Sequence, residues 1–189
     1  KAVLRDVKLY DPKGLFLSAP EIRLDWWPVS WLSNRLSIDD LNIPTARLYR
    51  VWRFNPSKAP SGKILPDFDI RIMRLKVGQL EVDKAVTGRA DVFAIDGDAD
   101  IRDGRALVDL SARALRGKDR LLLALDSRPD NNRFDVDLTV NAPKGGLLAA
   151  MAGLQQDANL RLEGDGDWAL WKGRLVATQA VGRDLTERK

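Results

Sequence analysis

The stretch at residues 22–43, IRLDWWPVSWLSNRLSIDDLNI, contains the two patterns on which the fold depends. It opens with apolar residues at every second position from Ile22 to Trp26, which is the period of a β-strand with one buried face. Pro28 suits the first position of a helical turn, so we predict such a turn directly after this strand. The stretch closes with LSIDDLNI, in which apolar residues stand first, third, sixth and eighth.

The spacing of LSIDDLNI occurs at two further places near the start of the chain. In this spacing, two apolar residues are two positions apart, as in a β-strand, and so are the next two, but one extra residue separates the pairs. This is the pattern of a strand with a bulge in its middle. A pattern that recurs in this way indicates one structural unit used repeatedly. The apolar positions of the copies are Ala2, Leu4, Val7 and Leu9; Leu36, Ile38, Leu41 and Ile43; and Ile70, Ile72, Leu75 and Val77.

The composition excludes several classes of function before any fold is considered. The 189 residues are 44% hydrophobic and 31% charged, which is typical of a globular chain. The net charge is +4 and the basic residues are scattered, so we expect no nucleic-acid partner. The chain contains no cysteine and no histidine, which excludes thiol catalysis, thiolate metal sites and histidine-based triads.

No targeting or membrane-spanning segment is visible. The longest apolar run, LLAAMA at residues 147–152, is far shorter than the ~20 residues of a spanning helix. The chain begins without a methionine or a signal peptide, and a strand pattern is already present there. We therefore expect residues 1–189 to be one segment cut from a longer protein.

Apolar and polar residues alternate through most of the chain after residue 68. Long helical patterns never separate the strands, so we predict an all-β fold, an antiparallel meander with one apolar and one polar face. NPSKAPSG at residues 55–62 predicts a mobile loop, and residues 145–154 predict one short helix. The residues that we assign to the apolar inner face are Phe93, Ile95, Val108, Leu110, Leu121, Leu123, Leu125, Phe134, Val136, Leu138, Val140, Leu160 and Leu162.

A sheet with one apolar face must bury that face. Periodicity alone is compatible with a closed barrel, a two-sheet sandwich or a sheet curled into an open trough, and it favours a closed core. The repeated bulges favour curling, because a bulge bends its strand and raises the local twist. An open trough would need a cover, and lipid acyl chains fit this role. At about 0.8 kcal/mol per methylene, a two-chain phospholipid hides on the order of 20 kcal/mol of apolar surface from water.

Three phrases follow one another along the chain: LDWWPVSWLSNRLSIDDLNIPTARLYRV, then APKGGLLAAMAGL, then LRLEGDGDWALWKGRL. Together they resemble the periplasmic part of the TamB family, the large subunits of translocation and assembly modules in Gram-negative bacteria. This family belongs to the wider AsmA-like group of bridge-like lipid carriers. The resemblance covers most of the chain and is weakest at residues 55–66.

The resemblance implies both a fold and a function. The family has a long β-sheet bent into a taco shape (a β-taco) with an apolar groove, and its members are regarded as phospholipid conduits between the inner and outer membranes. The chain would then be an N-terminal segment of a periplasmic shaft, attached to the inner membrane through an upstream anchor. The implied partners are phospholipid and an outer-membrane protein of the TamA type. No catalytic residue or cofactor is carried over, and the open trough becomes the favoured shape.

The tryptophans Trp26, Trp27 and Trp31 have two interpretations. Indole rings favour the headgroup region of a bilayer, which predicts a membrane-interface belt near an upstream anchor. Alternatively, they plug the end of the apolar trough, and we slightly favour this second interpretation. The helix at residues 147–154 is similarly either a lid that touches a membrane or, as its flanking glycines favour, an element that closes one edge of the groove.

Asp96, Asp98 and Asp100 alternate as at the start of a calcium-binding loop. An EF-hand needs glycine at its sixth position and glutamate at its twelfth, where this chain has Ile101 and Leu107. We therefore interpret the aspartates as the solvent face of a strand and predict no metal site. No serine stands in the context of a nucleophile elbow, so we predict no enzyme.

Two hypotheses follow. The first is a lipid conduit segment, which depends on the side chains of the inner face. The second is a scaffold that binds outer-membrane protein strands by β-augmentation, which depends on the backbone of the sheet edges. A charged residue on the inner face should abolish the first function and spare the second.

Overall fold

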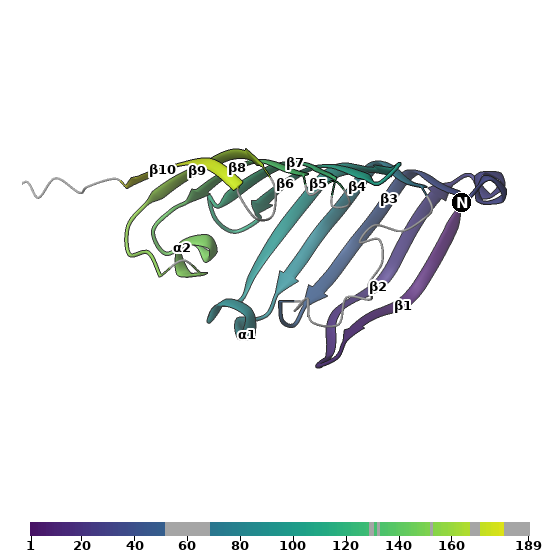
Figure 1. Ribbon diagram of the computed structural model, residues 1–189. Helices are drawn as coiled ribbons and strands as arrows, with labels where there is room; N and C mark the ends of the chain where they lie inside the picture. Colours follow the sequence, from purple (N-terminus) through teal and green to yellow (C-terminus); the bar gives the residue numbers. More distant parts are fainter. Residues whose placement is uncertain (52–68, 129–130, 132, 152, 167–170, 180–189) are drawn as a thin grey trace, which may run out of the picture.

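A ten-stranded sheet forms the body of the structure, a computed structural model that describes residues 1–51, 69–128, 131, 133–151, 153–166 and 171–179. The strands lie in the sheet in the order in which they occur in the chain, and the sheet does not close into a barrel (Figure 1). This confirms the predicted all-β meander. The strands are β1 (Ala2–Asp11), β2 (Gly14–Trp26), β3 (Arg35–Leu48), β4 (Asp69–Val82), β5 (Asp91–Arg102), β6 (Arg105–Ala114), β7 (Arg120–Arg128), β8 (Arg133–Ala142), β9 (Ala158–Gly166) and β10 (Trp171–Gln179).

Short helices occupy three connections. The predicted turn after the first tryptophans is a 3₁₀ helix, η1 (Pro28–Ser33), and the predicted short helix at 145–154 is α2 (Leu147–Met151). A second α-helix, α1 (Lys84–Thr87), was not predicted. None of the helices in the described part of the chain is long and apolar enough to cross a membrane. The loop predicted at 55–62 lies outside the described residues.

One pair of strands departs from the antiparallel pattern. β3 and β4 are parallel, with Leu36 beside Ile70 and Ile43 beside Val77. These residues begin and end two copies of the repeated spacing, so the extra residues of the two strands lie side by side and the apolar positions stay in register. Parallel neighbours need a connection of about a dozen residues or more, and the segment between Leu48 and Asp69 is long enough for this.

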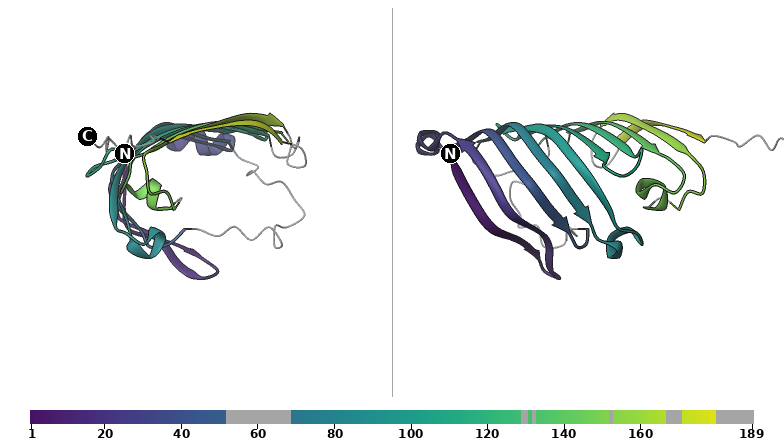
Figure 2. Two further views of the ribbon diagram at one scale, coloured as in Figure 1. Left: turned by 90° about the vertical axis from the view of Figure 1, so that its left-hand side faces the viewer. Right: turned by 180° about the vertical axis from the view of Figure 1, so that it is seen from behind.

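The sheet is strongly curved, and register shifts accompany the curvature. The extra residues lie in β2 between Leu15 and Leu17, in β3 between Ile38 and Asp40, and at two places in β4, between Ile72 and Leu75 and between Val77 and Leu80. Extra residues at such points bend a strand toward one face. Figure 2 shows the result: seen along the row of strands, the sheet is an open, bent layer with α2 inside its hollow side.

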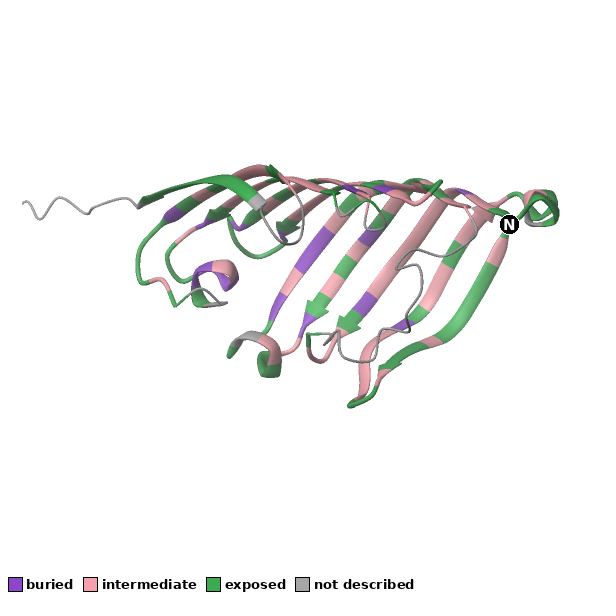
Figure 3. Ribbon diagram, in the orientation of Figure 1, coloured by how far each residue is buried: buried purple, intermediate pink, exposed green. Residues whose placement is uncertain are grey.

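The buried residues form two small clusters on this hollow side. One contains Ala19, Ala46 and Val77, and the other contains Phe93 and Leu147 with two neighbours from β4 and β6. Most other strand residues are intermediate or exposed, as Figure 3 shows. The fold therefore has little fully buried core for the size of its sheet.

Candidate functional site

All of the residues that the sequence analysis assigned to the inner face lie on one face of the sheet. In an antiparallel ladder, directly paired residues point to the same side. The pairing aligns them in three rows across the strands, which we call the apolar rows. The first row contains Ile95, Leu121, Val140 and Leu160, with Ala112 of β6 between Ile95 and Leu121; the second contains Leu110, Leu123, Leu138 and Leu162; and the third contains Val108, Leu125 and Val136. Phe93 lies beyond the first row and Phe134 beyond the third.

The apolar rows line the concave face. Leu147 of α2 packs against Val82, Phe93 and Ala114, and Phe93 is on the same face as Ile95, two residues further along β5. Since α2 lies in the hollow of the sheet (Figure 2), the face that it touches is the concave one. The sequence alone did not decide which face is concave.

Coverage of the concave face is uneven. Near α2, Leu147 is 2% exposed and Phe93 is 6% exposed. Along the second row, by contrast, Leu110, Leu123 and Leu138 are only half-buried, and among the described residues no helix or strand packs over them. The rows therefore form an apolar surface that remains open to a ligand or to a further layer of chain.

Charge is segregated between the two faces. Among the described residues of β5 to β9 that point to the concave side, Asp91 is the only charged one, and it lies at the start of β5 beside Val82. The convex side carries ion pairs such as Arg105–Asp126, in which Nη2 and Oδ2 are 2.6 Å apart, and Arg102–Asp100 at 2.5 Å. The distribution favours an apolar occupant for the concave side.

Two aspartates of the sheet's surface have perturbed pKa values. The hydrogen bonds from Arg105 hold the pKa of Asp126 below its ordinary value. The backbone N–H of Ala85 and then the guanidinium of Arg47 lower the pKa of Asp83, which caps α1. Both groups belong to ion pairs outside the apolar rows, and these pairs account for the direction of both shifts.

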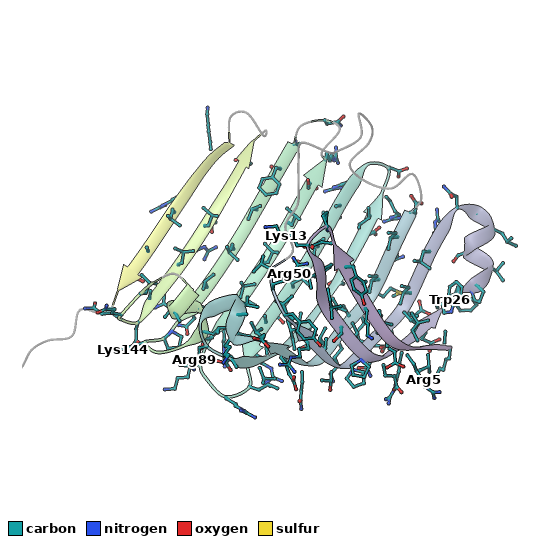
Figure 4. The ribbon with its side chains drawn as sticks, turned by 90° about the horizontal axis from the view of Figure 1, so that it is seen from below. Arg5, Lys13, Trp26, Arg50, Arg89 and Lys144 are labelled. Carbon is teal, nitrogen blue, oxygen red and sulfur yellow. The ribbon has the colours of Figure 1, made fainter. Side chains whose placement is uncertain are left out.

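The tryptophans do not form one cluster in the part of the chain that the structure describes. Trp26 pairs with Ile38 on the concave face, at the end of the sheet where β2 meets η1 (Figure 4). Trp27 is 62% exposed, and its indole Nε1 donates to Asp39 Oδ2 at 2.8 Å. The side chain of Trp31 lies outside the description. The position of Trp26 is compatible with a plug at the end of the trough. The exposed position of Trp27 is compatible with contact at a membrane interface.

The alternating aspartates have a structural explanation. Asp96 and Asp98 lie on the convex side opposite Ser111 and Asp109, and the described residues include no group of three or more possible metal ligands. Gly97, between them, is required by the approach of β6: a Cβ atom there would lie 2.2 Å from the backbone oxygen of Asp109. The motif that resembles a calcium loop is thus a strand with a glycine at a close backbone contact.

The residues that hold α2 in place gave no signal in the sequence. Asp119, in the turn between β6 and β7, is 1% exposed, and its Oδ1 accepts the N–H of Leu148 at 2.9 Å. Arg89 donates to the backbone oxygen of Gly145 on the other side. The turn RGKD, residues 116–119, is polar, and its sequence gave no indication that Asp119 is buried. This burial depends on Leu148, which is distant in sequence.

Comparisons with protein families, with curated proteins and with solved structures found no match for this chain. The site is therefore interpreted from its own geometry.

Proposed function

We propose that this chain is a non-enzymatic segment of a lipid conduit, in which the apolar rows shield phospholipid acyl chains from water. The observation that carries the proposal is the continuity of the rows across β5 to β9 on a concave, half-exposed and nearly uncharged face. Large exposed apolar surfaces in a soluble protein mark a binding site. A trough open along its length suits a chain-shaped occupant better than a compact one.

The resemblance to the TamB family supports the same function and suggests its setting. In that setting the segment lies in the periplasm, is attached to the inner membrane in the full-length protein, and supports outer-membrane biogenesis with a partner of the TamA type. Phospholipid is the ligand, and no cofactor or chemistry is involved.

Native mass spectrometry of the protein purified from cells, with lipid extraction, tests this proposal. Leu123→Arg places a guanidinium in the second apolar row, and Leu122→Arg places the same group one residue away on the convex side, where Leu122 is 55% exposed. We expect co-purified phospholipid in the unmodified protein and in Leu122→Arg, and its loss in Leu123→Arg and in Val136→Asp. A folded Leu123→Arg variant that retains phospholipid would exclude the conduit.

A second candidate function is a scaffold that binds strands of outer-membrane proteins by β-augmentation. It is favoured by the two sheet edges: among the described strands, β1 pairs only with β2 and β10 only with β9. β1 also exposes Val3 and Leu4. An open edge with apolar side chains is a template for a further strand.

Proline substitution at the β1 edge distinguishes the two functions. Successive N–H groups of an edge strand alternate between its partner and solvent, so one of Val3→Pro and Leu4→Pro removes an outward N–H and the other removes a ladder hydrogen bond. If the scaffold is correct, the better-folded of the two variants loses client-peptide binding in a pull-down and keeps its phospholipid. Retained client binding in that variant would exclude the β1 edge as the binding site.

A further inference from the structure

A distinct apolar cavity lies between α2 and the last strands of the sheet. Its volume is ≈ 400 Å³, and Leu148 and Leu154 line it from the α2 side. Val140, Leu160 and Ala177 line it from β8, β9 and β10. These three residues are paired in register, and two of them belong to the first apolar row. The cavity is therefore a roofed continuation of the concave face.

The roof is held in place by contacts that are distant in sequence. The buried carboxylate of Asp119 accepts the N–H of Leu148, and the backbone oxygen of Asp119 accepts the N–H of Ala114 at 2.9 Å. Gly146 lies so close to this carboxylate that a Cβ atom would be 2.4 Å from Oδ1. Leu147 packs against Phe93 beneath. A five-residue helix has little stability of its own, so these contacts determine its position.

One lysine flanks the cavity at the same edge of the sheet. Lys144 follows Ala142 by two residues, and its backbone N–H is fixed by Asp157 Oδ1 at 2.6 Å. Arg120 lies beside Asn141 in the register of β7 and β8, but it precedes Leu121 by one residue and therefore points to the convex side, away from the cavity. The side chain of Lys144 is exposed, and it forms no ion pair with another described residue. Figure 4 shows Lys144 at the end of the strands, beside α2.

We propose that this cavity binds a single unbranched alkyl chain of an anionic amphiphile, with α2 as a fixed roof and Asp119 as the residue that positions it. An apolar cavity of about 150 Å³ already binds benzene, so the space here suffices for a substantially longer hydrocarbon. The anionic group would lie near Lys144. This inference rests on the lipid-binding function proposed above and narrows it to one end of the concave face.

Laurate with a ¹³C-labelled terminal methyl group is a suitable probe. In NMR spectra of the full chain, we expect contacts between this methyl group and the methyl groups of Leu148 and Leu154. Ala177→Phe fills the cavity from an exposed position, and Val176→Phe adds the same ring on the opposite face of β10. We expect Ala177→Phe to remove these contacts and weaken laurate binding by about tenfold, the loss of roughly two buried methylenes. Contacts that survive in Ala177→Phe would overturn the proposal.

Substitutions at Asp119 test the roof. Asp119→Asn keeps an oxygen that accepts the N–H of Leu148, whereas Asp119→Ala removes it. We expect Asp119→Ala to lose the laurate contacts and to speed amide hydrogen exchange in residues 147–151, and Asp119→Asn to retain both properties. If Asp119→Ala binds laurate as the unmodified protein does, with its sheet intact by circular dichroism, α2 is not a roof.

The headgroup preference is tested with probes of opposite charge. Laurate should bind more tightly than dodecyltrimethylammonium, and Lys144→Glu should reduce this difference. Equal binding of the two probes would overturn the anionic assignment.

Phospholipid retention distinguishes this proposal from the conduit. Failure of the cavity alone leaves phospholipid bound to the unmodified protein but no laurate contact at α2. Failure of the conduit is seen instead in a Leu123→Arg variant that keeps its phospholipid.

Discussion

At the scale of single residues, the contact between Gly146 and Asp119 makes a sharp prediction. In Gly146→Ala the new methyl group would lie 2.4 and 2.5 Å from the two carboxylate oxygens of Asp119, so one of the groups must move. We expect a loss of about 1–3 kcal/mol in the free energy of unfolding, as for other overpacked sites, measured in urea.

Two further variants separate the clash from other effects of alanine. Gly145→Ala meets no atom within 4 Å but has a φ of +72°, so it reports backbone strain alone, roughly 1–2 kcal/mol. Combining Gly146→Ala with Asp119→Ala removes the clash, so the two costs should not add. Additive costs would show that the two residues do not meet.

The ion pair of Arg105 and Asp126 predicts a pH dependence of stability. The pKa of Asp126 is lower in the folded state than its ordinary value. The pair therefore stabilises the protein fully above the unfolded-state pKa, about 4, and this contribution is lost as the pH falls through the folded-state pKa. Asp126→Asn should flatten the acid side of a plot of unfolding free energy against pH. Asp98→Asn is the control, since Asp98 has no ion-pair partner among the described residues. An unchanged acid side in Asp126→Asn would contradict the assignment.

Single residues also show why part of the site could not be predicted. The face of Leu123 or Val136 follows from alternation, because the strand period of two fixes the side on which each residue lies. The burial of Asp119 follows from no local pattern, because it depends on α2 returning to contact the turn between β6 and β7. Residues that act through distant partners are the ones that sequence reasoning misses.

At the scale of elements, the repeated spacing identified the strands but not their pairing. The copies at Leu36 and Ile70 predict strands of the same shape, and the structure places them side by side and parallel. An antiparallel partner was expected because most neighbours along a meander are joined by short turns. α1 was missed because four residues cannot display helical periodicity. Its signals were only the capping Asp83 and Gly88, with a φ of 81°.

The close approach of β5 and β6 at Gly97 gives an element-scale prediction. A Cβ atom at Gly97 would lie 2.2 Å from the backbone oxygen of Asp109 and 2.6 Å from Cδ2 of Leu110. Because the backbone oxygen belongs to the ladder itself, Gly97→Ala should separate the two strands and cost about 1–3 kcal/mol or more. Hydrogen exchange should accelerate in β5 and β6 and stay unchanged in β1 and β2. Equal acceleration of hydrogen exchange in all strands would contradict a disturbance confined to β5 and β6.

At the scale of the whole molecule, the open, curved shape follows from features that the sequence displays separately. Alternation predicts the apolar face, and the extra residues in the repeats predict the bend. What no local pattern supplies is the direction of the bend relative to that face. The structure places the apolar rows on the concave side. There the curved sheet flanks a bound ligand on both sides and shields it from water better than a convex surface would. Under the proposed function, the stability of the fold depends on the ligand that covers the rows.

This dependence predicts that ligand and stability are linked. A ligand that binds only the folded state adds about 2.7 kcal/mol when its free concentration is 100 times its Kd. For a chain of this size, that corresponds to an increase of about 5–10 °C in Tm. Removal of lipid should therefore lower the Tm measured by calorimetry, and added phospholipid should restore it. Leu122→Arg should retain this response and Leu123→Arg should lack it, because only Leu123 lies in the apolar rows. If delipidation left the Tm unchanged in every variant, the concave face would have another cover, and a client strand or a further layer of chain would become the better candidate.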